Sequence, residues 1–434
     1  MMHDYHLRKK SCVFSLAGLL VAVMASNAAA ETLEQAWTIA RDADHGLKAS
    51  RDNSVAAANQ LAAAKSARLP VLSMGANYFA LTNLPELKAD LLSQSFQIPL
   101  AQRNSVLYDA TATLPIYTGG RIEHGIAAAA SSLKAAELNE TANEQDLKLR
   151  VAEAYINVLR ASRGLKVAES HVTSLEAHAH DVDNLFQQGM AAKSAQLSAQ
   201  VALLDARQQF LQASNSLNLA RAAYNHLLGR ALDQPVMLDE LSLEPTDDTL
   251  TVLTNRALDQ RSELKVMDRQ VAALRDQATA VRRETAPQVG LSGSYNYVQD
   301  RYLVHEDQWS VAVGIKWNVF DGGAARHRGS AVELQSSALF EQRDGLALAI
   351  GLQVRQAWLD VQETRKRISV TQSAIAQAEE NLRVVRDRYV NGLTPHTEVL
   401  EAETLRVNSA TNHANAVYDA VLASLRLKYA IGEL

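Results

Sequence analysis

Histidines form the densest group of residues in this sequence that could bind a metal. His171, His178 and His180 lie within ten residues, and imidazole nitrogens are common zinc ligands. On a helix, positions 171 and 178 share a face two turns apart, whereas 178 and 180 lie on different faces. Solvated histidines on a helix surface therefore explain the group better than a metal site does, and metal binding by these three residues stays an open alternative.

No group of residues has the pattern of a catalytic site. The sequence has no Gly-x-Ser-x-Gly motif, no phosphate-binding loop and no paired cysteines. Asp321 precedes two glycines, which is typical of a strand-to-helix turn that needs helix capping and positive φ. The only cysteine, Cys12, lies in the N-terminal segment described next. We therefore expect neither an enzyme nor a cofactor.

The segment 1–30 has the three parts of a secretory signal. A basic start, Arg8 to Lys10, precedes an apolar run over 13–24 and small residues at 28–30. The apolar run is short for a membrane span, so we favour a cleaved signal over a single anchor helix. The whole chain has a formal net charge of −5, and the loss of the basic signal makes it more acidic, which argues against a nucleic-acid partner.

No other run of about eighteen apolar residues occurs, so the sequence predicts no transmembrane helix. A chain of this kind would have to enter a membrane with strands.

Self-similarity at a fixed offset divides the chain into two repeats. Gly189 and Gly392 are 203 residues apart, and the same offset pairs other positions without a gap. These pairs are Gly119-Gly120 with Gly322-Gly323, Ala154-Tyr155 with Ala357-Trp358, Leu197 with Leu400, and Leu228-Gly229 with Ile431-Gly432. We therefore expect a first repeat over 31–229, a linker or equatorial segment over 230–249, and a second repeat over 250–434, each beginning with helices.

Each repeat contains two segments with the alternation of strands. From Trp309 to Val319, apolar and polar residues alternate at period two, which is the pattern of a sheet with two different faces. The strands are expected over 71–82, 104–116, 288–300 and 307–320. Because the first repeat is 14 residues longer between its opening helices and its hairpin, we expect a longer loop there, over 81–104.

Trp309 and Trp317 flank the clearest of these strands. They are eight residues apart, about 26 Å at roughly 3.3 Å per residue. Outer-membrane barrels have an apolar band of about this height with aromatic residues at both edges. The two tryptophans are therefore predicted to be membrane-interface anchors, and the loop 81–104 would be extracellular. A soluble, half-buried sheet is the alternative.

A long helical hairpin is predicted after the strands of each repeat, over 119–229 and 322–432. Proline is absent from 121–228, and a division at Gly164 would give helices of about 65 and 95 Å at 1.5 Å per residue. Two adjacent apolar seams indicate helical neighbours on both sides, as in a tube of helices. The seams are Leu149, Ala152, Ile156 and Leu159, and Leu147, Val151, Ala154 and Val158.

Four strands cannot cross a membrane alone, because each unpaired amide or carbonyl at an open edge costs several kcal/mol in hydrocarbon. Two copies would make a barrel filled by its own side chains, whereas three make twelve strands with a lumen. The predicted fold class is therefore an α+β membrane protein. It is a trimeric, twelve-stranded transmembrane β-barrel with four strands per chain, continued by a long periplasmic α-helical barrel and built from a tandem duplication.

Several short motifs recur in order through the chain. They are Leu33-Glu-Gln-Ala36, Pro70, Pro287, Leu114-Pro-Ile-Tyr-Thr-Gly-Gly-Arg121, Val319-Phe-Asp-Gly-Gly323, Ala154-Tyr-Ile-Asn-Val-Leu159, Arg388-Tyr-Val-Asn-Gly-Leu393, Val399-Leu400 and Ala402. In this order the chain resembles the outer-membrane efflux protein family, the TolC-like channels, over nearly all of 32–432. The resemblance implies a homotrimer in the outer membrane of a Gram-negative cell, extending into the periplasm. It also implies an equatorial belt and docking to a periplasmic adaptor and an inner-membrane pump.

Charged residues in the second hairpin are candidates for the pore and its gate. Glu379 and Glu380, repeated by threefold symmetry, would form an acidic ring of the kind that selects cations, although a solvated exterior face is an equal alternative. Arg365 and Arg367 are placed at the hairpin turn, where they would attract these acids. The turns themselves would be the adaptor-contact tips, at Arg163, Gly164, Leu165, Lys366 and Ile368.

The leading functional hypothesis is a passive exit duct of a tripartite efflux pump for small toxic compounds. The exit channel of a type I protein secretion system is the alternative within the same architecture. A structural coiled-coil protein or adhesin is the alternative outside it. The partners expected are two further copies, the adaptor, the pump and outer-membrane lipid.

Overall fold

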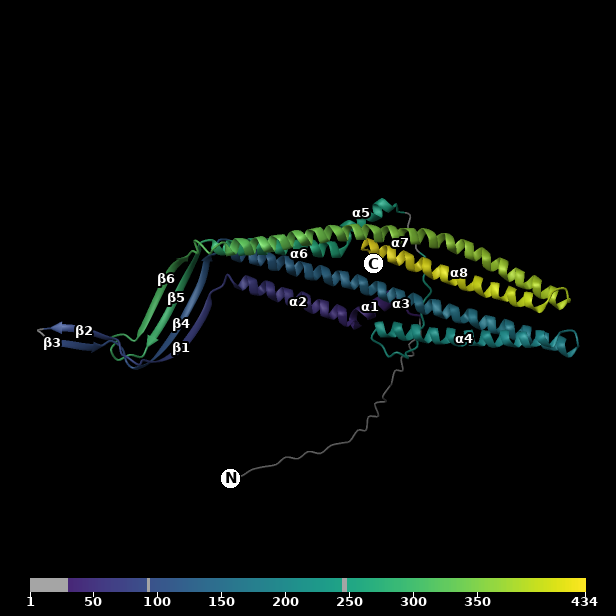
Figure 1. Cartoon of the computed structure of the whole chain (residues 1–434), viewed down its shortest axis with the longest axis horizontal. Helices are drawn as coiled ribbons and strands as arrows, with labels where there is room; N and C mark the ends of the chain where they lie inside the picture. Colours follow the sequence, from purple (N-terminus) through teal and green to yellow (C-terminus); the bar gives the residue numbers. More distant parts are fainter. Residues whose placement is uncertain (1–29, 92–93, 244–247) are drawn as a thin grey trace, which may run out of the picture.

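The chain forms one elongated molecule with strands at one end and long helices extending away from them (Figure 1). The computed structural model describes residues 30–91, 94–243 and 248–434. The predicted signal segment 1–30 therefore lies outside the described residues, apart from Ala30. Within the described ranges, no helix is both long enough and apolar enough to cross a membrane.

A four-stranded antiparallel sheet combines the strands of both repeats. The strands are β1 (Val71–Ala80), β4 (Asn104–Tyr117), β5 (Gln288–Val298) and β6 (Asp307–Lys316), in the order β1-β4-β5-β6. The strands lie in the four segments that alternate in sequence, but β6 ends at Lys316, four residues before the expected end at 320. The central pair, β4 with β5, joins the first repeat to the second.

The register of the sheet gathers apolar side chains on one face. Leu72 pairs with Ala112, Ala112 with Gly293, and Gly293 with Val311, so one row crosses all four strands. Because side chains alternate between faces, the neighbouring row of Ser73, Thr111, Ser294 and Ser310 lies on the other face. The sheet therefore has one apolar face and one polar face.

A loop was expected from the sequence between β1 and β4, but this long segment is more than a loop. It contains a two-stranded antiparallel hairpin, β2 (Glu86–Leu91) with β3 (Gln94–Pro99). The alternation of polar and apolar residues within 86–91 and 94–99 was the available signal, but both runs are short and prolines at 85 and 99 stand at their ends, which favoured a loop. In Figure 1 it extends beyond the sheet, at the end of the molecule away from the long helices.

Two very long helices lead away from the sheet. They are α3 (Arg121–Gln187) and α7 (Ala324–Val390), each about 100 Å long at 1.5 Å per residue. Each begins after a glycine pair with positive φ, 62° and 88° at Gly119 and Gly120 and 70° and 85° at Gly322 and Gly323. The chain then turns back through α4 (Lys193–Leu227) and α8 (His396–Ile431). We call α3 with α4 the first hairpin and α7 with α8 the second hairpin.

Shorter helices and the linker cover the middle of the molecule. The helices are α1 (Leu33–Ala43), α2 (His45–Ser66), α5 (Leu250–Gln260), α6 (Ser262–Arg282) and the 3-10 turn η1 (Arg283–Thr285). α2 and α6 pack beside the sheet-proximal halves of the long helices (Figure 1). The segment after α4 pairs with the start of the chain through a parallel bridge between Glu31 and Leu238.

In the middle of the molecule, each repeat has its own apolar core. The first includes Leu33, Leu147, Val151, Tyr155 and Tyr224, and the second includes Leu253, Ile350, Val354, Ala357 and Leu427. A third, small cluster of Leu382, Val399 and Ala402 lies within the second hairpin, nearer its turn.

Candidate functional site

The turns of the two hairpins lie together at the end of the molecule remote from the sheet (Figure 1). They have the same backbone geometry. Gly189 and Gly392 have positive φ angles of 74° and 68°, and the next amide reaches back five residues in both. Met190 N donates to Leu185 O at 2.8 Å, and Leu393 N donates to Arg388 O at 2.9 Å. This is the Schellman helix ending, in which glycine supplies the left-handed residue.

Each turn presents an apolar side chain to solvent. Met190 is 67% exposed and Leu393 is 68% exposed, and the two are equivalent positions of the repeats. Val390, at the end of α7, is also exposed. Exposed apolar side chains at the end of a solvated rod are suited to burial against a protein partner, since interface cores are enriched in such residues.

The predicted tip residues are not at the tips. Arg163, Gly164 and Leu165 lie inside α3, and Lys366 and Ile368 lie inside α7, about 35 Å before the turns at 1.5 Å per residue. Glycine inside a helix costs only about 1 kcal/mol, which a long packed helix can absorb. The turns lie instead at 188–192 and 391–395, where the repeated glycines and Pro395 were the available signal.

Arg367 joins the hairpins, but not in the way the gate hypothesis assumed. Its Nη2 donates to Asp419 Oδ2 of α8 at 2.7 Å, and Arg160 Nη2 of α3 donates to Asp419 Oδ1 at 2.5 Å. Asp419 therefore bridges an arginine from each hairpin, about 35 Å from the turns. Arg365 is close by on α7, inside the same helix rather than at a turn.

Glu380 has its partner on its own helix. Arg383 donates to both of its carboxylate oxygens, at 2.6 and 2.8 Å, and also to Asp387 at 3.0 Å. The Arg383 hydrogen bond lowers the pKa of Glu380, and both groups are exposed. Glu379 is likewise exposed. Within the chain Arg367 binds Asp419 and Glu380 binds Arg383, and the attraction of these acids to Arg365 and Arg367 across neighbouring hairpins stays a prediction.

The three histidines on α3 have different surroundings. His171 Nδ1 lies 3.2 Å from Glu403 Oε1, His178 is buried between hairpins, and His180 is exposed. In the part of the chain that the structure describes, no group of three or more metal-binding side chains is assembled. Sequence reasoning missed the residues that surround them, Tyr389, His396, Glu403 and Arg406, because they come from a helix pair more than 200 residues away.

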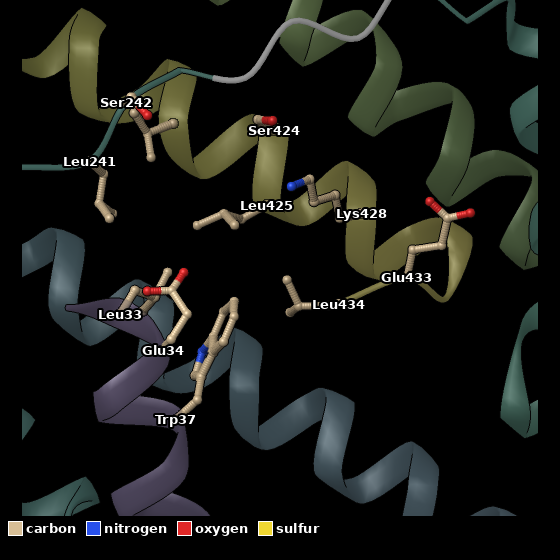
Figure 2. Close-up of a pocket in the computed structure, with 11 residues that line it drawn as sticks. Leu33, Glu34, Trp37, Leu241, Ser242, Ser424, Leu425, Lys428, Glu433 and Leu434 are labelled. Atoms are coloured by element: carbon tan, nitrogen blue, oxygen red, sulfur yellow. The ribbon is translucent and has the colours of Figure 1, made fainter.

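A cavity of about 250 Å³ lies in the middle of the molecule, between α1, the end of α8 and the linker. Figure 2 shows Leu33 and Trp37 facing Leu425 and Leu434 across it. Trp37 Nε1 donates to Lys148 O at 2.8 Å, which fixes the ring as one wall. The cavity is remote from both the turns and the sheet, and it belongs to the packing of α1 and the linker against α8.

The apolar face of the sheet is the second candidate surface. Trp309 is 75% exposed and Val313 is 68% exposed, and Val311 and Ile315 share their face. Trp309 packs on Tyr295 of β5 with ring centroids 4.7 Å apart. Trp317 is also exposed and donates its Nε1 to Thr285 O at 3.1 Å. A continuous apolar surface this exposed is typical of a binding or membrane surface.

The comparisons with known proteins agree with this arrangement. The model of the family described as outer membrane efflux protein matches residues 36–230 and 253–433, most of both repeats. The chain belongs to this family. Its location is accordingly the outer membrane of a Gram-negative cell, and an efflux protein is a channel and not an enzyme.

This efflux protein is similar to two curated relatives over most of their length. The outer membrane protein TolC of Vibrio cholerae is 22% identical over 417 residues, which cover 93% of this chain and 91% of that protein. The protein CyaE of Bordetella pertussis is 26% identical over 327 residues, which cover 72% of this chain and 68% of that protein.

Solved structures share the fold. VceC, an outer membrane protein of Vibrio cholerae, has a TM-score of 0.78 at 19% identity, covering 92% of this chain and 96% of that chain. The outer membrane channel MtrE of Neisseria gonorrhoeae, in its open state, has a TM-score of 0.74 at 18% identity, covering 92% and 88%. The predicted fold class of an outer-membrane efflux channel, with strands continued by long helices in two repeats, is thereby confirmed.

Proposed function

We propose that this efflux protein is the exit duct of a tripartite pump, built from three copies, and that it passively conducts small toxic compounds to the exterior. The observation that carries the proposal is the sheet: one face is apolar and exposed, and the sheet ends at β1 and β6. An open-edged sheet with an apolar outer face is stable in a bilayer only if other strands pair with its edges.

Three copies satisfy this requirement and leave a lumen. The sheet has four strands, so three copies give a barrel of twelve, with β1 of one copy against β6 of the next. The polar face of serines and threonines would then line the lumen, as in barrels that contain water. The apolar face, between Trp309 and Trp317, would contact outer-membrane lipid.

The two turns support a docking role for the opposite end. Met190 and Leu393 are exposed in equivalent turns, and threefold symmetry would present six such turns as a ring. A periplasmic adaptor, carrying the inner-membrane pump, would bind this ring. The adaptor contact is therefore proposed at 188–192 and 391–395 rather than near Gly164 and Lys366.

The proposal is tested by assembly, conductance and cargo together. We expect the purified full chain to be a trimer in detergent and to give single-channel conductance steps in planar bilayers. Val313→Arg places a charge on the apolar face and should block membrane assembly, because an arginine facing lipid at mid-bilayer destabilises a barrel by about 2–4 kcal/mol. Gly314→Arg, on the polar face, is the matched control and should assemble.

Cargo is tested in a strain that lacks the chain. We expect that strain to become sensitive to small toxic compounds while it still secretes proteins, and the restored chain to reverse the sensitivity. A secretion defect with unchanged sensitivity would assign the chain to a type I secretion system instead. A monomer in detergent without conductance would contradict the channel proposal.

A further inference from the structure

Polar and aromatic side chains, of which His178 and Glu403 are buried, join the first hairpin to the second, close behind the turns. We call His171, His178, Tyr389, His396 and Glu403 the inter-hairpin cluster. His171 and His178 belong to α3, and Tyr389 is near the end of α7. His396 and Glu403 are near the start of α8. α3 and α8 pack side by side over this part of the molecule (Figure 1), so the cluster lies at the contact between hairpins.

Glu403 is the fixed polar centre of the cluster. Its side chain is 1% exposed, and Arg406 donates to its two oxygens at 2.6 and 3.1 Å. His171 of α3 lies 3.2 Å from Oε1. Arg386 of α7 lies 4.0 Å from Oε2 and donates to Ser174 Oγ of α3. A buried carboxylate is thus satisfied by groups from three helices, which holds the hairpins in one alignment.

His178 occupies the aromatic half of the cluster, nearer the turns. It is 4% exposed, and its ring lies 5.4 Å from the ring of Tyr389 and 6.3 Å from that of His396, to which it is nearly parallel. His178 Nε2 and His396 Nδ1 are buried and have no hydrogen-bond partner among the described residues. A neutral imidazole tolerates such a place better than a charged one, which would have two N–H donors to satisfy.

The charged groups around His178 do not favour a positive ring overall. Arg386 of α7 and His396 of α8 oppose a proton on it, whereas Asp181 of its own helix and Glu403 of α8 favour one. Glu403 is already engaged by Arg406 and His171. The packed arrangement therefore disfavours protonation of His178, through burial and like charge together.

We propose that the packed rings of His178 and His396 are an acid-sensitive contact between the two hairpins of one chain. When either ring gains a proton, α3 separates from the α7–α8 turn, and the tips loosen. The contact itself does not depend on the channel assignment. Its effect on conduction, a wider tip end at acidic pH, rests on the proposed function.

The sign and the pH window follow from the two histidines. Burial, His396 and Arg386 lower the pKa of His178 from its usual 6.5 to about 4, and burial lowers the pKa of His396. In the separated state His178 would titrate near its ordinary value, so only that state binds a proton between about pH 6.5 and 4. Packing is therefore stable above this window and weakens as pH falls through it, by about thirtyfold in the packing equilibrium at pH 5.

The test is a distance between the hairpins at two pH values. Spin labels are attached to Thr173→Cys on α3 and Glu401→Cys on α8, both exposed positions, in a full chain whose only native cysteine is Cys12. Electron spin resonance should give one short intrachain distance at pH 7.5. At pH 5.0 the distribution should shift reversibly to longer distances.

Two variants decide whether the shift comes from the cluster. His178→Phe keeps a ring against Tyr389 but cannot gain a proton, so the shift should be strongly reduced. His180→Phe, two residues away and exposed, should leave it unchanged. No shift in the parent chain, or an equal shift with His178→Phe, would overturn the proposal. If His178→Phe does not assemble, His178→Gln serves the same purpose, since a glutamine at this position cannot gain a proton either.

Conductance separates this inference from the function on which it partly rests. Open-channel conductance should rise between pH 7.5 and 5.0 in the parent and much less with His178→Phe. A pH-dependent distance without conductance at any pH would contradict the proposed duct and leave the acid-sensitive contact standing. Conductance steps without a pH-dependent distance would contradict the acid-sensitive contact and leave the proposed duct standing.

Discussion

The two repeats place their long helices alike but fill equivalent positions differently. Tyr155 of α3 and Trp358 of α7 are 203 residues apart, and each directly follows the equivalent alanine, Ala154 or Ala357. Tyr155 is completely buried, with its hydroxyl 2.6 Å from Glu31 O and 2.8 Å from Asp239 O. Trp358 is only half-buried, at the edge of the second core.

The difference comes from the linker. Glu31 precedes α1 and is bridged to the linker, which supplies Asp239, whereas Asp248, which precedes α5 at the equivalent place, pairs with Arg256. Burial raises the pKa of Tyr155, so its hydroxyl stays protonated and can donate to these carbonyls. Duplication thus preserves the helix contacts, while the linker decides which side chain fills them.

Truncation at these two equivalent positions should give the largest difference. Tyr155→Ala removes a fully buried ring and should lower the free energy of unfolding by about 3–5 kcal/mol. Trp358→Ala, which removes a larger but half-exposed side chain, should cost about half as much or less. Thermal unfolding of the detergent-solubilised protein measures both. Equal losses would mean that the linker does not stabilise the first core in the way argued here.

The second difference lies near the turns, where Glu403 is equivalent to Gln200. Glu403 is buried in the inter-hairpin cluster, whereas Gln200 is exposed. Glu403→Gln keeps the shape but loses charged hydrogen bonds to Arg406, and should cost about 2–3 kcal/mol. Gln200→Glu, the reciprocal change, should cost close to nothing, as surface substitutions usually do.

The pH dependence of the same carboxylate checks this prediction. Burial alone would raise its pKa, but hydrogen bonds from His171 and Arg406 outweigh burial and hold it at about 2, below the ordinary 4.5. The stability that Glu403 contributes is therefore complete above about pH 4.5 and is lost as pH falls from there towards 2. In Glu403→Gln this acidic loss should be smaller. A parent and variant with parallel stability curves from pH 5 to 2.5 would contradict the assignment.

The glycine pairs at the start of the long helices should show a smaller difference in stability between the repeats. Gly119 and Gly322 are equivalent and both have positive φ, 62° and 70°, so alanine costs about 1–2 kcal/mol of backbone strain at either. A Cβ at Gly119 would lie 2.3 Å from Ala286 Cβ, whereas one at Gly322 meets nothing within 4 Å. Gly119→Ala should therefore be worse than Gly322→Ala by about 1–3 kcal/mol, from overpacking. Identical melting temperatures for the two variants would show that the sheet-to-helix junction relaxes.

Local pattern and the fixed offset predict much of this fold. The alternation around Trp309 to Ile315 locates β6, and the glycine pairs mark where α3 and α7 begin. The turns were misplaced because Gly164 and the basic residues near Arg367 have local features of a helix end, while the long packed neighbours that keep the helix continuous are distant in sequence. For the same reason the partners of Arg367 and His178 could not be predicted. Asp419 and His396 come from a helix whose position depends on the misplaced turn.

The smallest effect is expected at the bridge that joins the hairpins without any repeat symmetry. Asp419 binds Arg160 and Arg367, but the equivalent of Arg367 is Gly164 and that of Asp419 is Ser216. The side chains are 29–39% exposed, so each pair contributes about 0.2–1 kcal/mol.

Arg367→Ser should therefore leave assembly intact and raise conductance modestly in planar bilayers without adaptor or pump, because α7 and α3 lose their shared partner and the hairpins align less firmly. Glu380→Gln is the matched control. It breaks a more exposed pair, with Arg383 on the same helix, so it should not change conductance. If it reduced cation preference, Glu380 would face the pore as the sequence analysis proposed. Equal conductance in the parent and Arg367→Ser would remove the Asp419 bridge from the gate, because a contact affects opening only if it differs between the closed and open states.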